Sequence, residues 1–471
     1  MTTATVNAQT TGATRPPATR PEPAPSDATP DMRAPVKVAY VVSRFPKLTE
    51  TFVLYELIAM EAMGVAVELF PLRRERQPVA HPEADRWTRR ARFQPFVSLP
   101  ILRAQLHFLR RSPGRYLALL VEVLRRTWGS ANFFLGALAY FPKSVRFAYE
   151  MERDGVTHVH AHFCNHPALA AFIVHRLTGI PFSFTAHGSD LHVERRMLDA
   201  KVDAAAFAVT ISRFNERVMT DACGSAAGAK IRVVHCGVDV EAFTARPAER
   251  TEGPFRILCV ASFEEVKGHR HLLDACALLR ERGIDFACDL VGEGPLRREM
   301  EARIARLELG DRVHVLGGRP RPEIIRMFRA ADVAVLASQP TRQGKREGIP
   351  VVLMEAMASG LPAVSTRLSG IPELVEDGHT GLLVPPADAV ALADALERLA
   401  RDPELRRRMG AAGRAKVVRE FDLRVNTAAL LDLFHRPGGS EVPVPPHAGR
   451  EFTIAPAPSV AILQEAGHEI R

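Results

Sequence analysis

Two stretches of this chain alternate short runs of β-branched and apolar residues with longer segments whose apolar residues recur at helical spacing. This alternation is typical of βαβ units, in which parallel strands are joined by helices that cover the sheet. The chain has 471 residues, more than one compact core usually holds, so we expect two domains. The expected fold class is α/β, with two Rossmann-like, doubly wound domains that face a cleft between them.

The expected strands of the first region are 36–42, 65–70, 156–161, 181–186, 206–211 and 230–235. Those of the second region are 255–261, 285–291, 311–317, 331–337, 361–366 and 381–386. We predict an N-terminal domain at 35–245, with an insertion of long helices at about 100–153, and a C-terminal domain at 254–435. A polar stretch at 244–254 is the expected linker. Segments 1–34 and 436–471 are rich in Ala and Pro, lack periodicity and are predicted to be disordered tails.

Composition points to the cytoplasm and excludes several classes of site. The six cysteines include no C-x-x-C pair, which argues against a zinc site or a disulfide framework and is consistent with a reducing compartment. We recognise no secretory signal and no apolar run of about 20 residues, so we expect neither export nor a membrane-spanning helix. Aromatic and basic residues are not interleaved as in nucleic-acid-binding motifs, so we expect no nucleic-acid partner.

The segment 346–362 is the most informative one. Its helical pattern VVLMEAMA is apolar except for Glu355, and Pro350 is suited to the first helical turn, which places Glu347 and Gly348 in the loop before it. A carboxylate in an apolar helix costs several kcal/mol unless it receives hydrogen bonds. A ribose diol could donate them, and the helix N-terminus could bind a diphosphate. An arginine from elsewhere in the fold could equally pair with Glu355, and the pattern alone leaves both partners open.

Two neighbouring segments also suggest a phosphate ligand. CVASFEEVKGHRHLL (259–273) predicts a strand, a turn and Lys267 at the start of a helix, where a cation can meet phosphates. DLVGEGPLRREM (289–300) predicts a strand, a turn with Gly292 and Gly294, and a helix opened by a proline. The third glycine of a dinucleotide fingerprint is replaced by Arg297, so a dehydrogenase is not expected.

Taken together, these motifs resemble those of the retaining family 4 glycosyltransferases, which have the GT-B fold, and are most similar to the colanic-acid and exopolysaccharide branch. The motifs of the second region are ASFEEVKG, VGEGPL, the E-x7-E element from Glu347 to Glu355, and SGIPELVEDGHTGLLVPP. Those of the first region are SRFPKLTETFVLYEL, HVHAHF, FSFTAHGSDLH, ISRFN and VVHCGVD. The resemblance covers roughly residues 36–420, with the motifs in the expected order.

The resemblance implies a role for each matching residue. Glu347 and His187 would act at the transferred sugar, Glu355 at the donor ribose and Lys267 at the diphosphate. The remaining donor-side positions would be Gly348, Ile349, Pro350, Gly292, Gly294 and Ser262. Because Lys267 would neutralise the leaving diphosphate, neither a metal nor a cofactor is expected beyond a UDP- or GDP-linked sugar.

Two positions depart from the family pattern. Ser262 stands where the family usually has an arginine, so another cation must compensate, and Arg346 and Arg321 are candidates by position. The first strand is followed by SRFPKLTET instead of a glycine-rich loop. We therefore expect side chains such as Arg44, Lys47 and Thr49 to contact the acceptor.

Three histidines alternate along the motif HVHAHF of the first region. His158, His160 and His162 share one face of the expected strand and could together bind zinc. We favour a second interpretation, in which His160 and His162 line the acceptor side of the cleft.

Positive charge is concentrated in one part of the chain. Between Arg73 and Arg146 there are 15 Lys or Arg and 4 Asp or Glu, a balance of +11, whereas the whole chain carries +8. Apolar residues at helical spacing accompany these arginines, as expected of a helix at an anionic membrane surface. A packed helix pair with a solvated arginine face is the alternative.

The predicted function is metal-independent hexosyl transfer, with retention, to a lipid-linked saccharide acceptor in surface polysaccharide biosynthesis. The enzyme would be cytoplasmic and peripherally attached to the inner membrane face. The alternatives are a non-catalytic relative that binds nucleotide sugars and a GT-B phosphorylase with pyridoxal phosphate.

Overall fold

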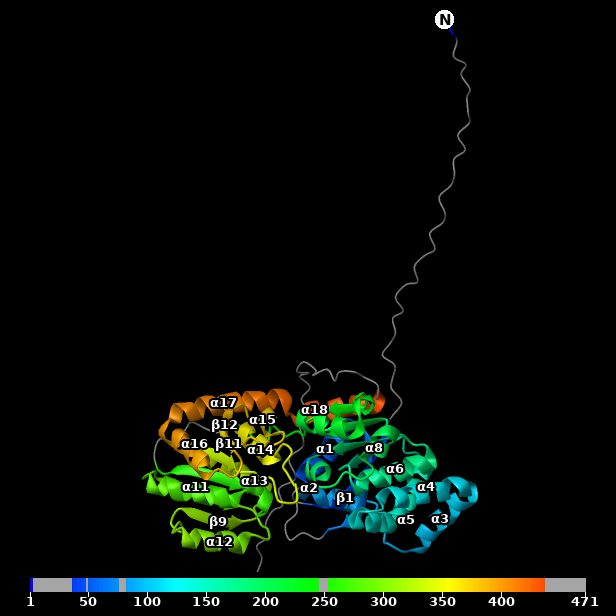
Figure 1. Cartoon of the computed structure of the whole chain (residues 1–471), viewed down its shortest axis with the longest axis horizontal. Helices are drawn as coiled ribbons and strands as arrows, with labels where there is room; N and C mark the ends of the chain where they lie inside the picture. The colour runs from blue at the N-terminus through cyan, green and yellow to red at the C-terminus, as the bar shows by residue number, and fades with distance from the viewer. Residues whose placement is uncertain (3–35, 48–49, 76–81, 245–252, 437–471) are drawn as a thin grey trace, which may run out of the picture. The chain divides into compact units, whose positions relative to one another are not determined.

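The computed structural model describes residues 1–2, 36–47, 50–75, 82–244 and 253–436. The predicted tails and linker fall almost entirely outside these residues. Within the described part, the chain forms two separate six-stranded sheets in which every strand pair is parallel (Figure 1). The expectation of two doubly wound α/β sheets is confirmed.

The first sheet has the strand order β2-β1-β3-β4-β5-β6. Its strands are β1 (Lys37–Phe45), β2 (Ala66–Arg74), β3 (His158–His162), β4 (Phe182–Ala186), β5 (Phe207–Thr210) and β6 (Ile231–Val233). All residues of β3, β4 and β5 are buried, because helices cover both faces of a parallel sheet. The chain order reverses between β1 and β3, and a doubly wound sheet binds ligands at the carboxyl ends of such neighbouring strands.

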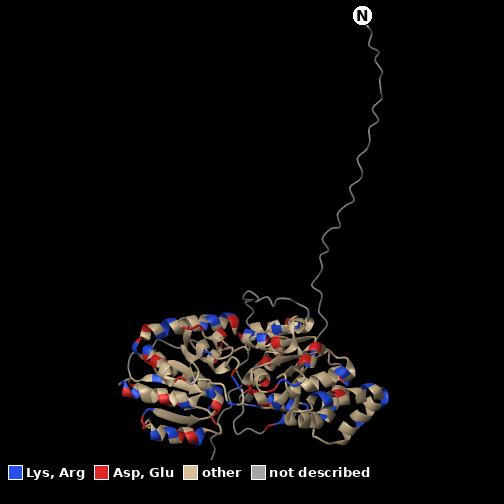
Figure 2. Ribbon diagram, viewed as in Figure 1, with Lys and Arg blue, Asp and Glu red and all other residues tan. Residues whose placement is uncertain are grey.

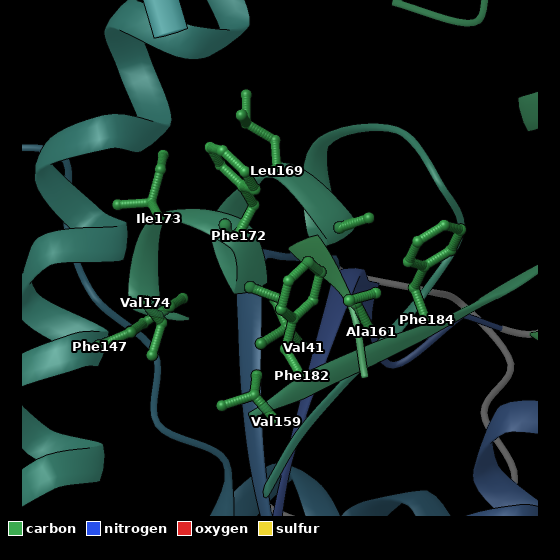
Figure 3. Packing of buried hydrophobic residues seen from close by; sticks show 14 of the residues in the cluster. Val41, Phe147, Val159, Ala161, Leu169, Phe172, Ile173, Val174, Phe182 and Phe184 are labelled. Atoms are coloured by element: carbon green, nitrogen blue, oxygen red, sulfur yellow. The ribbon is translucent and has the colours of Figure 1, made fainter. Parts of the chain in front are cut away.

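One face of this sheet packs against α6 (His166–Thr178), whose alanines and large apolar residues are all buried. Figure 3 shows Phe172 and Ile173 of α6 above Val159 and Phe182 of the neighbouring strands. The other helices after β1 and after β3 are α1 (Thr51–Ala62), α7 (Ser189–His192), α8 (Leu198–Ala204), α9 (Arg213–Cys223) and α10 (Ser225–Gly228). The Ser212 hydroxyl caps α9 by accepting the N–H of Asn215 at 3.1 Å, which fixes where this helix begins.

Four helices separate β2 from β3. They are α2 (Pro82–Arg90), α3 (Leu99–Arg111), α4 (Pro113–Thr127) and α5 (Ala131–Arg153). The last three match the predicted helical insertion, and α2 was not expected. Buried residues such as Phe108, Val123 and Phe141 join this insertion to the core of the first sheet, so it is part of the first domain.

The second sheet has the order β12-β11-β10-β7-β8-β9. Its strands are β7 (Phe255–Val260), β8 (Phe286–Val291), β9 (Val313–Gly317), β10 (Val333–Leu336), β11 (Ala363–Thr366) and β12 (Gly381–Val384). The accompanying helices are η1 (Glu265–Lys267), α11 (His269–Glu281), α12 (Arg297–Arg306), α13 (Arg321–Ala330), α14 (Val351–Ala358), α15 (Ile371–Leu374), α16 (Ala389–Arg401) and α17 (Pro403–Glu420). Here the order reverses between β7 and β10, whose following loops carry Lys267 and Glu347.

The last described helix, α18 (Leu423–His435), packs on the first sheet and not on the second. Leu430, Leu433 and Phe434 share a core with residues of β1 and α1. The predicted C-terminal boundary at 435 therefore differs from the packing, because the apolar face of α18 completes the core of the N-terminal domain. Conversely, Val238 and Phe243 belong to a core of the second sheet, although the prediction assigned them to the first domain.

The chain thus passes between the two domains at two places, and these places are joined by backbone hydrogen bonds. The Val238 N–H donates to the Phe421 carbonyl at 2.8 Å, and the Leu423 N–H donates to the Val238 carbonyl at 3.0 Å. The backbones are so close here that a Cβ on Gly237 would overlap the backbone of Leu423.

Candidate active site

Two loops of the second domain meet through an ion pair between Lys267 and Glu347. Lys267 ends η1, directly after β7, and Glu347 lies in the loop between β10 and α14. The Lys267 ammonium is 2.9 Å from the Glu347 carboxylate, and both side chains are partly exposed. Parallel strands β7 and β10 are neighbours, so their carboxyl ends bring together two residues that are 80 positions apart.

A second ion pair joins the same two loops, and here the lysine belongs to the loop after β10 and the glutamate to the loop after β7. The Lys345 ammonium is 2.5 Å from Oε2 of Glu264, and the Ser262 hydroxyl donates to Oε1 of Glu264 at 3.3 Å. Burial favours a raised pKa for Glu264, but the hydrogen bond and charge of Lys345, helped by Lys267, hold that pKa below its ordinary value. The Glu264 carboxylate is therefore ionised at neutral pH.

Helix α14 carries Glu355 among apolar residues, as predicted. Pro350 is the residue immediately before the helix, one position earlier than expected, and the preceding Ile349 is buried. Burial raises the pKa of Glu355 to about 7, although the positive charge of Arg321 opposes that rise. In the described residues the two side chains form no ion pair within 4.0 Å, so Arg321 is a charge neighbour and does not use up the carboxylate.

Arg321 opens α13 and is fixed by several groups. Its guanidinium is 3.6 Å from Asp239 and stacks over the rings of Tyr55 and Phe243, at 4.3 Å and 5.1 Å from their centroids. The predicted alternative, an arginine that faces Glu355, is thus present as a long-range interaction. The positive charge of Arg321 therefore acts on two carboxylates, those of Glu355 and Asp239.

Loops from the two domains touch at Gly348. A Cβ on Gly348 would overlap the carbonyl oxygen of His187 and would lie 2.8 Å from Ile211, while a Cβ on Gly188 would lie 3.0 Å from the Gly348 nitrogen. Only glycine allows this approach of the two backbones. Glu347 and His187, the two residues that the resemblance assigns to the reaction, therefore lie on loops that are in direct contact.

The His187 imidazole turns inward and forms part of a hydrogen-bonded chain. Its Nε2 is 3.0 Å from Nδ1 of His162, whose Nε2 is 3.2 Å from the Glu56 carboxylate. On the other side, Nδ1 of His187 is 3.7 Å from Sγ of Cys236. Burial, with a contribution from His162, holds the pKa of His187 well below its ordinary value, and burial raises the pKa of the Cys236 thiol.

This series of hydrogen bonds fixes the tautomers of the His162 and His187 rings. The Glu56 carboxylate accepts the Nε2–H of His162, which leaves Nδ1 of His162 as an acceptor for the Nε2–H of His187. Nδ1 of His187 then carries no proton and faces the thiol of Cys236. Asp190 fixes the loop itself by accepting the backbone N–H groups of His187 and Gly188 at 3.1 Å and 2.7 Å.

The other two histidines of HVHAHF lie in the interior of the first domain. His160 is fully buried, and its two ring nitrogens bond the hydroxyls of Ser183 and Thr185 at 2.8 Å and 3.0 Å. His158 packs against Phe434 of α18. His160 was expected to line the acceptor side of the cleft. Its side chain is instead buried in the first domain, because α18 covers this face of β3.

The three histidines of HVHAHF do not come together as the zinc alternative would require. The ligand atoms that lie within 4.8 Å of one another belong to Glu56, His160 and His162, and His158 is not among them. Each of the three already takes part in the hydrogen bonds given above, so the donor set is used within the protein.

The turn with Gly292 and Gly294 packs against the loop that follows β7. A Cβ on Gly292, whose φ is +151°, would overlap the carbonyl oxygen of Ala261, and a Cβ on Gly294 would lie 2.7 Å from the backbone of Phe263. Both glycines are thus required by the approach of two protein loops. Their predicted role in the approach to a nucleotide stays a prediction.

The expected acceptor residues lie at the end of β1. Arg44 is exposed and 3.6 Å from Glu75, and Lys47 pairs with Glu50 at 2.5 Å. Thr49 lies outside the described residues.

Sequence reasoning did not identify Glu373, which follows α14 in the chain and reaches the other domain. Its carboxylate accepts the backbone N–H groups of Arg213 and Phe214, the first two residues of α9, at 2.8 Å and 2.9 Å. A carboxylate is favourable at a helix N-terminus, and here it links the second domain to the first. The proline before Glu373 indicates a helix start, but nothing in the sequence indicates which helix it caps.

The basic insertion exposes apolar as well as charged residues. Ten of the thirteen exposed large apolar residues in the described chain lie between Phe96 and Leu138. They are Phe96, Val97, Leu99, Leu102, Leu106, Leu117, Val121, Trp128, Leu135 and Leu138. Figure 2 shows mainly basic residues along α3 and α4. We call these exposed residues, on α3, α4, α5 and the segments next to them, the insertion surface. Among the described helices, none is both long and apolar enough to cross a membrane.

Comparisons with known proteins agree with this geometry. Residues 49–242 match the family described as Glycosyltransferase Family 4, and residues 242–416 match Glycosyl transferases group 1. The putative colanic acid biosynthesis glycosyltransferase WcaL of Salmonella typhimurium is 32% identical over 413 residues, which cover 84% of this chain and 99% of that protein. The amylovoran biosynthesis glycosyltransferase AmsK of Erwinia amylovora is 39% identical over 207 residues, 44% of this chain and about half (51%) of that relative.

A solved structure supports the fold. The Anabaena protein HepE, in complex with UDP-glucose, superposes with a TM-score of 0.62 at 17% identity and covers 84% of this chain and 99% of its own. Two facing doubly wound domains of this arrangement define the GT-B class of glycosyltransferases. The present chain belongs to glycosyltransferase family 4, a retaining family, and the relatives named above include exopolysaccharide biosynthesis enzymes.

Proposed function

We propose that this chain transfers a hexose from a UDP- or GDP-linked donor, with retention, to a lipid-linked saccharide during the synthesis of a surface polysaccharide. The observation that carries the proposal is the junction of the loops after β7 and β10, where Lys267 and Glu347 form an ion pair at 2.9 Å. This junction lies at the reversal point of the second sheet, which is where doubly wound sheets bind their ligands. A loop of the first domain reaches the same place, because the backbone of His187 packs directly against Gly348.

We propose the following roles from the family resemblance, and the contacts described above are consistent with them. Lys267 binds the donor diphosphate, and Glu355 accepts hydrogen bonds from the ribose diol. Glu347, released from Lys267 by the diphosphate, faces the transferred sugar. The acceptor hydroxyl oxygen bonds to the anomeric carbon on the face from which the diphosphate leaves. The bond from that carbon to the phosphate oxygen breaks, and the leaving phosphate takes the hydroxyl proton.

A donor-hydrolysis assay tests the proposal. The purified chain is expected to release UDP or GDP slowly from a matched nucleotide sugar, and Glu347→Ala is expected to abolish this release while donor binding persists. Binding without turnover in the wild-type protein would indicate the non-catalytic alternative. A bound chromophore with the absorbance of pyridoxal phosphate would indicate a phosphorylase.

We also propose that the insertion surface binds an anionic membrane from the cytoplasmic side, which would bring the site to a lipid-linked acceptor. Leu99, Leu102 and Leu106 are spaced three and four residues apart along α3, so they form one stripe, and the exposed Arg103 and Arg110 flank it. In the described chain neither arginine has an acidic partner within 4.0 Å, in contrast to Arg111, which pairs with Glu152. Unpaired arginines beside exposed leucines complement an anionic lipid surface.

Vesicle sedimentation at low salt tests this surface. Wild-type protein is expected to bind phosphatidylglycerol-containing vesicles but not pure phosphatidylcholine. Changing both Arg103 and Arg110 to Gln should weaken binding by about 30-fold, since each basic residue contributes about 1 kcal/mol. Val390→Ser, which removes an exposed apolar residue of the second domain, is the control and should bind normally. Failure of the wild-type protein to bind anionic vesicles would contradict the proposal.

A further inference from the structure

The loops after β7 and β10 are held together by two reciprocal ion pairs. The first loop contributes Glu264 and Lys267, and the second contributes Lys345 and Glu347. Each loop thus supplies one acid and one base, and the four charges cancel. An anion that entered this junction would find two ammonium groups, each already close to its position and each held by a carboxylate.

One ammonium group is not enough for the ligand proposed above. A diphosphate bonded to a nucleoside and a sugar carries about two negative charges, and Lys267 neutralises one of them. Hydrogen bonds between ionised partners are the strong ones, so a second cation at the junction would contribute substantially to binding.

The two arginines considered from the sequence alone are engaged elsewhere. Arg321 is held by Asp239 and by the rings of Tyr55 and Phe243. Arg321 therefore lies outside this pair of loops, on α13. Arg346 is exposed. The pKa of His192, in the first domain, is lowered mainly by burial; a hydrogen bond with Asn215 opposes this, and the positive charge of Arg346 lowers the pKa further. Arg346 lies in the second loop, between Lys345 and Glu347, but its charge acts on a histidine of the first domain.

Lys345 lies beside the position where the family arginine is missing. Its ammonium and the Ser262 hydroxyl contact the two oxygens of one carboxylate, that of Glu264. The ammonium of Lys345, a residue of the opposite loop, therefore lies close to Ser262.

The loop that carries Lys345 is a tight, hydrogen-bonded turn. The Thr341 N–H donates to the Lys345 carbonyl at 3.0 Å, and the Lys345 N–H donates to the Thr341 hydroxyl at 3.1 Å. Gly344, with φ +83°, closes the turn by donating to the Thr341 carbonyl at 2.9 Å. The backbone of Lys345 is thus fixed before any ligand binds, and only its side chain must exchange partners.

We propose that Lys345 is the second diphosphate-binding cation of this enzyme, acting in place of the arginine that Ser262 replaces, and that Glu264 holds its ammonium until the donor binds. The inference rests on the proposed function, because it assigns a further residue to the same donor site. It predicts an exchange of partners: the diphosphate takes Lys267 from Glu347 and Lys345 from Glu264.

The exchange predicts different changes in diphosphate affinity when Lys345 or Glu264 is removed. Removal of Lys345 weakens diphosphate binding because a cation is lost. Removal of Glu264 strengthens it or leaves it unchanged, because the competitor for Lys345 is gone and a negative charge leaves the site. If the pair only held the loops together, both changes would weaken binding alike.

Calorimetric titration of the full chain with UDP, GDP, UMP and GMP tests the inference. Lys345→Ala is expected to lower the affinity for whichever diphosphate binds, UDP or GDP, by about tenfold or more. The affinity for the matching monophosphate should fall clearly less. Glu264→Ala is expected to bind that diphosphate at least as tightly as the wild type. Introducing Ser262→Arg into the Lys345→Ala variant should restore most of the lost affinity, because the cation returns from the first loop.

Arg342→Ala is the matched control, since it removes a positive charge from an exposed position of the same turn, and its diphosphate affinity should match that of the wild type. Thermal melting of each variant separates a binding defect from unfolding, and Lys345→Gln serves if the alanine variant melts early. Unchanged diphosphate affinity in Lys345→Ala, or weakened affinity in Glu264→Ala, would overturn the inference. Failure of the wild-type chain to bind either diphosphate would instead count against the proposed function.

Discussion

The two domains bring opposite chemistry to the place where their loops meet. The second domain contributes charges: Lys267, Lys345, Glu264 and Glu347, arranged as ion pairs between two loops. The first contributes neutral imidazoles and aromatic rings, with His187 packed between Phe52, at 4.5 Å between ring centroids, and Phe163, at 4.8 Å. The same type of sheet thus carries lysine–glutamate ion pairs in one case, and in the other buried neutral rings that end on one carboxylate, that of Glu56.

The difference follows from what each surface is proposed to bind. A diphosphate donor is anionic and requires cations held in place. A saccharide acceptor offers hydroxyl groups, which suit neutral rings and backbone groups. Burial lowers the pKa of His158 to about 3 and that of His160 and His187 well below the ordinary value, so these rings of the first domain stay neutral at physiological pH.

The sharpest way to break this comparison is to remove a charge from the second domain. Glu347→Gln keeps the shape of the side chain and is expected to lower kcat by about 10²–10³-fold, in the range of lost electrostatic stabilisation at a reacting centre. The affinity for UDP or GDP should change little or increase, because Lys267 is released from its carboxylate partner. Steady-state kinetics and calorimetry measure the two effects, and a variant with full kcat would remove Glu347 from the reaction.

A change in the neutral network of the first domain should have a smaller effect. His162→Phe keeps a ring but removes the acceptor of the His187 Nε2–H, and we expect kcat/KM to fall by about 3–10-fold, the range for one hydrogen bond. The ¹⁵N NMR signals of the imidazole of His187 should report loss of the Nε2-protonated form. His175→Gln, which alters a histidine on the other side of this sheet, should leave both unchanged. A wild-type His187 protonated at Nδ1 would contradict the tautomers assigned above.

The smallest expected effect is on stability, and its sign depends on pH. Glu355 has a pKa of about 7 in the folded chain, whereas an unfolded chain ionises it near its ordinary value. The unfolded state therefore loses its proton first as pH rises, and stability falls between those two pKa values and stays lower above pH 7. Glu355→Gln removes this loss, so its Tm should exceed that of the wild type by about 2–4 °C at pH 8.

The gain of Glu355→Gln should vanish near pH 4.5, where the wild-type carboxyl is protonated in both states. Scanning calorimetry without ligand at the two pH values provides the comparison. Nucleotide-diphosphate affinity at pH 8 should fall at the same time, as expected if the carboxylate is kept for the ribose at a cost in stability. An equal Tm difference at both pH values would show that the effect does not come from ionisation.

Much of the fold could be predicted from the sequence because each strand is a short buried run with its own helix. All twelve expected strands appear, with boundaries that differ by a few residues. The partner of α18 could not be predicted, since the apolar face of Leu430 and Phe434 indicates burial but not the sheet that it covers. Helix α2 was missed because its composition is mostly polar and charged.

The candidate site divides in the same way. Glu355 and Lys267 stood out because a carboxylate in an apolar helix and a cation after a strand are local features. Lys345 and Glu264 did not, because their contact joins loops 81 residues apart and each residue alone looks like an ordinary surface charge. Glu56 and Cys236 were missed for a related reason: only the packed structure aligns them with His162 and His187.

The position of α18 has a consequence for cutting the chain. A break after Thr244 would give a first fragment without the helix that covers His158 and His160, and a second fragment in which Leu430 and Phe434 are exposed. Each fragment would carry the missing surface of the other. Coexpressed as separate polypeptides, the two should therefore find each other and reassemble, whereas either one alone should aggregate.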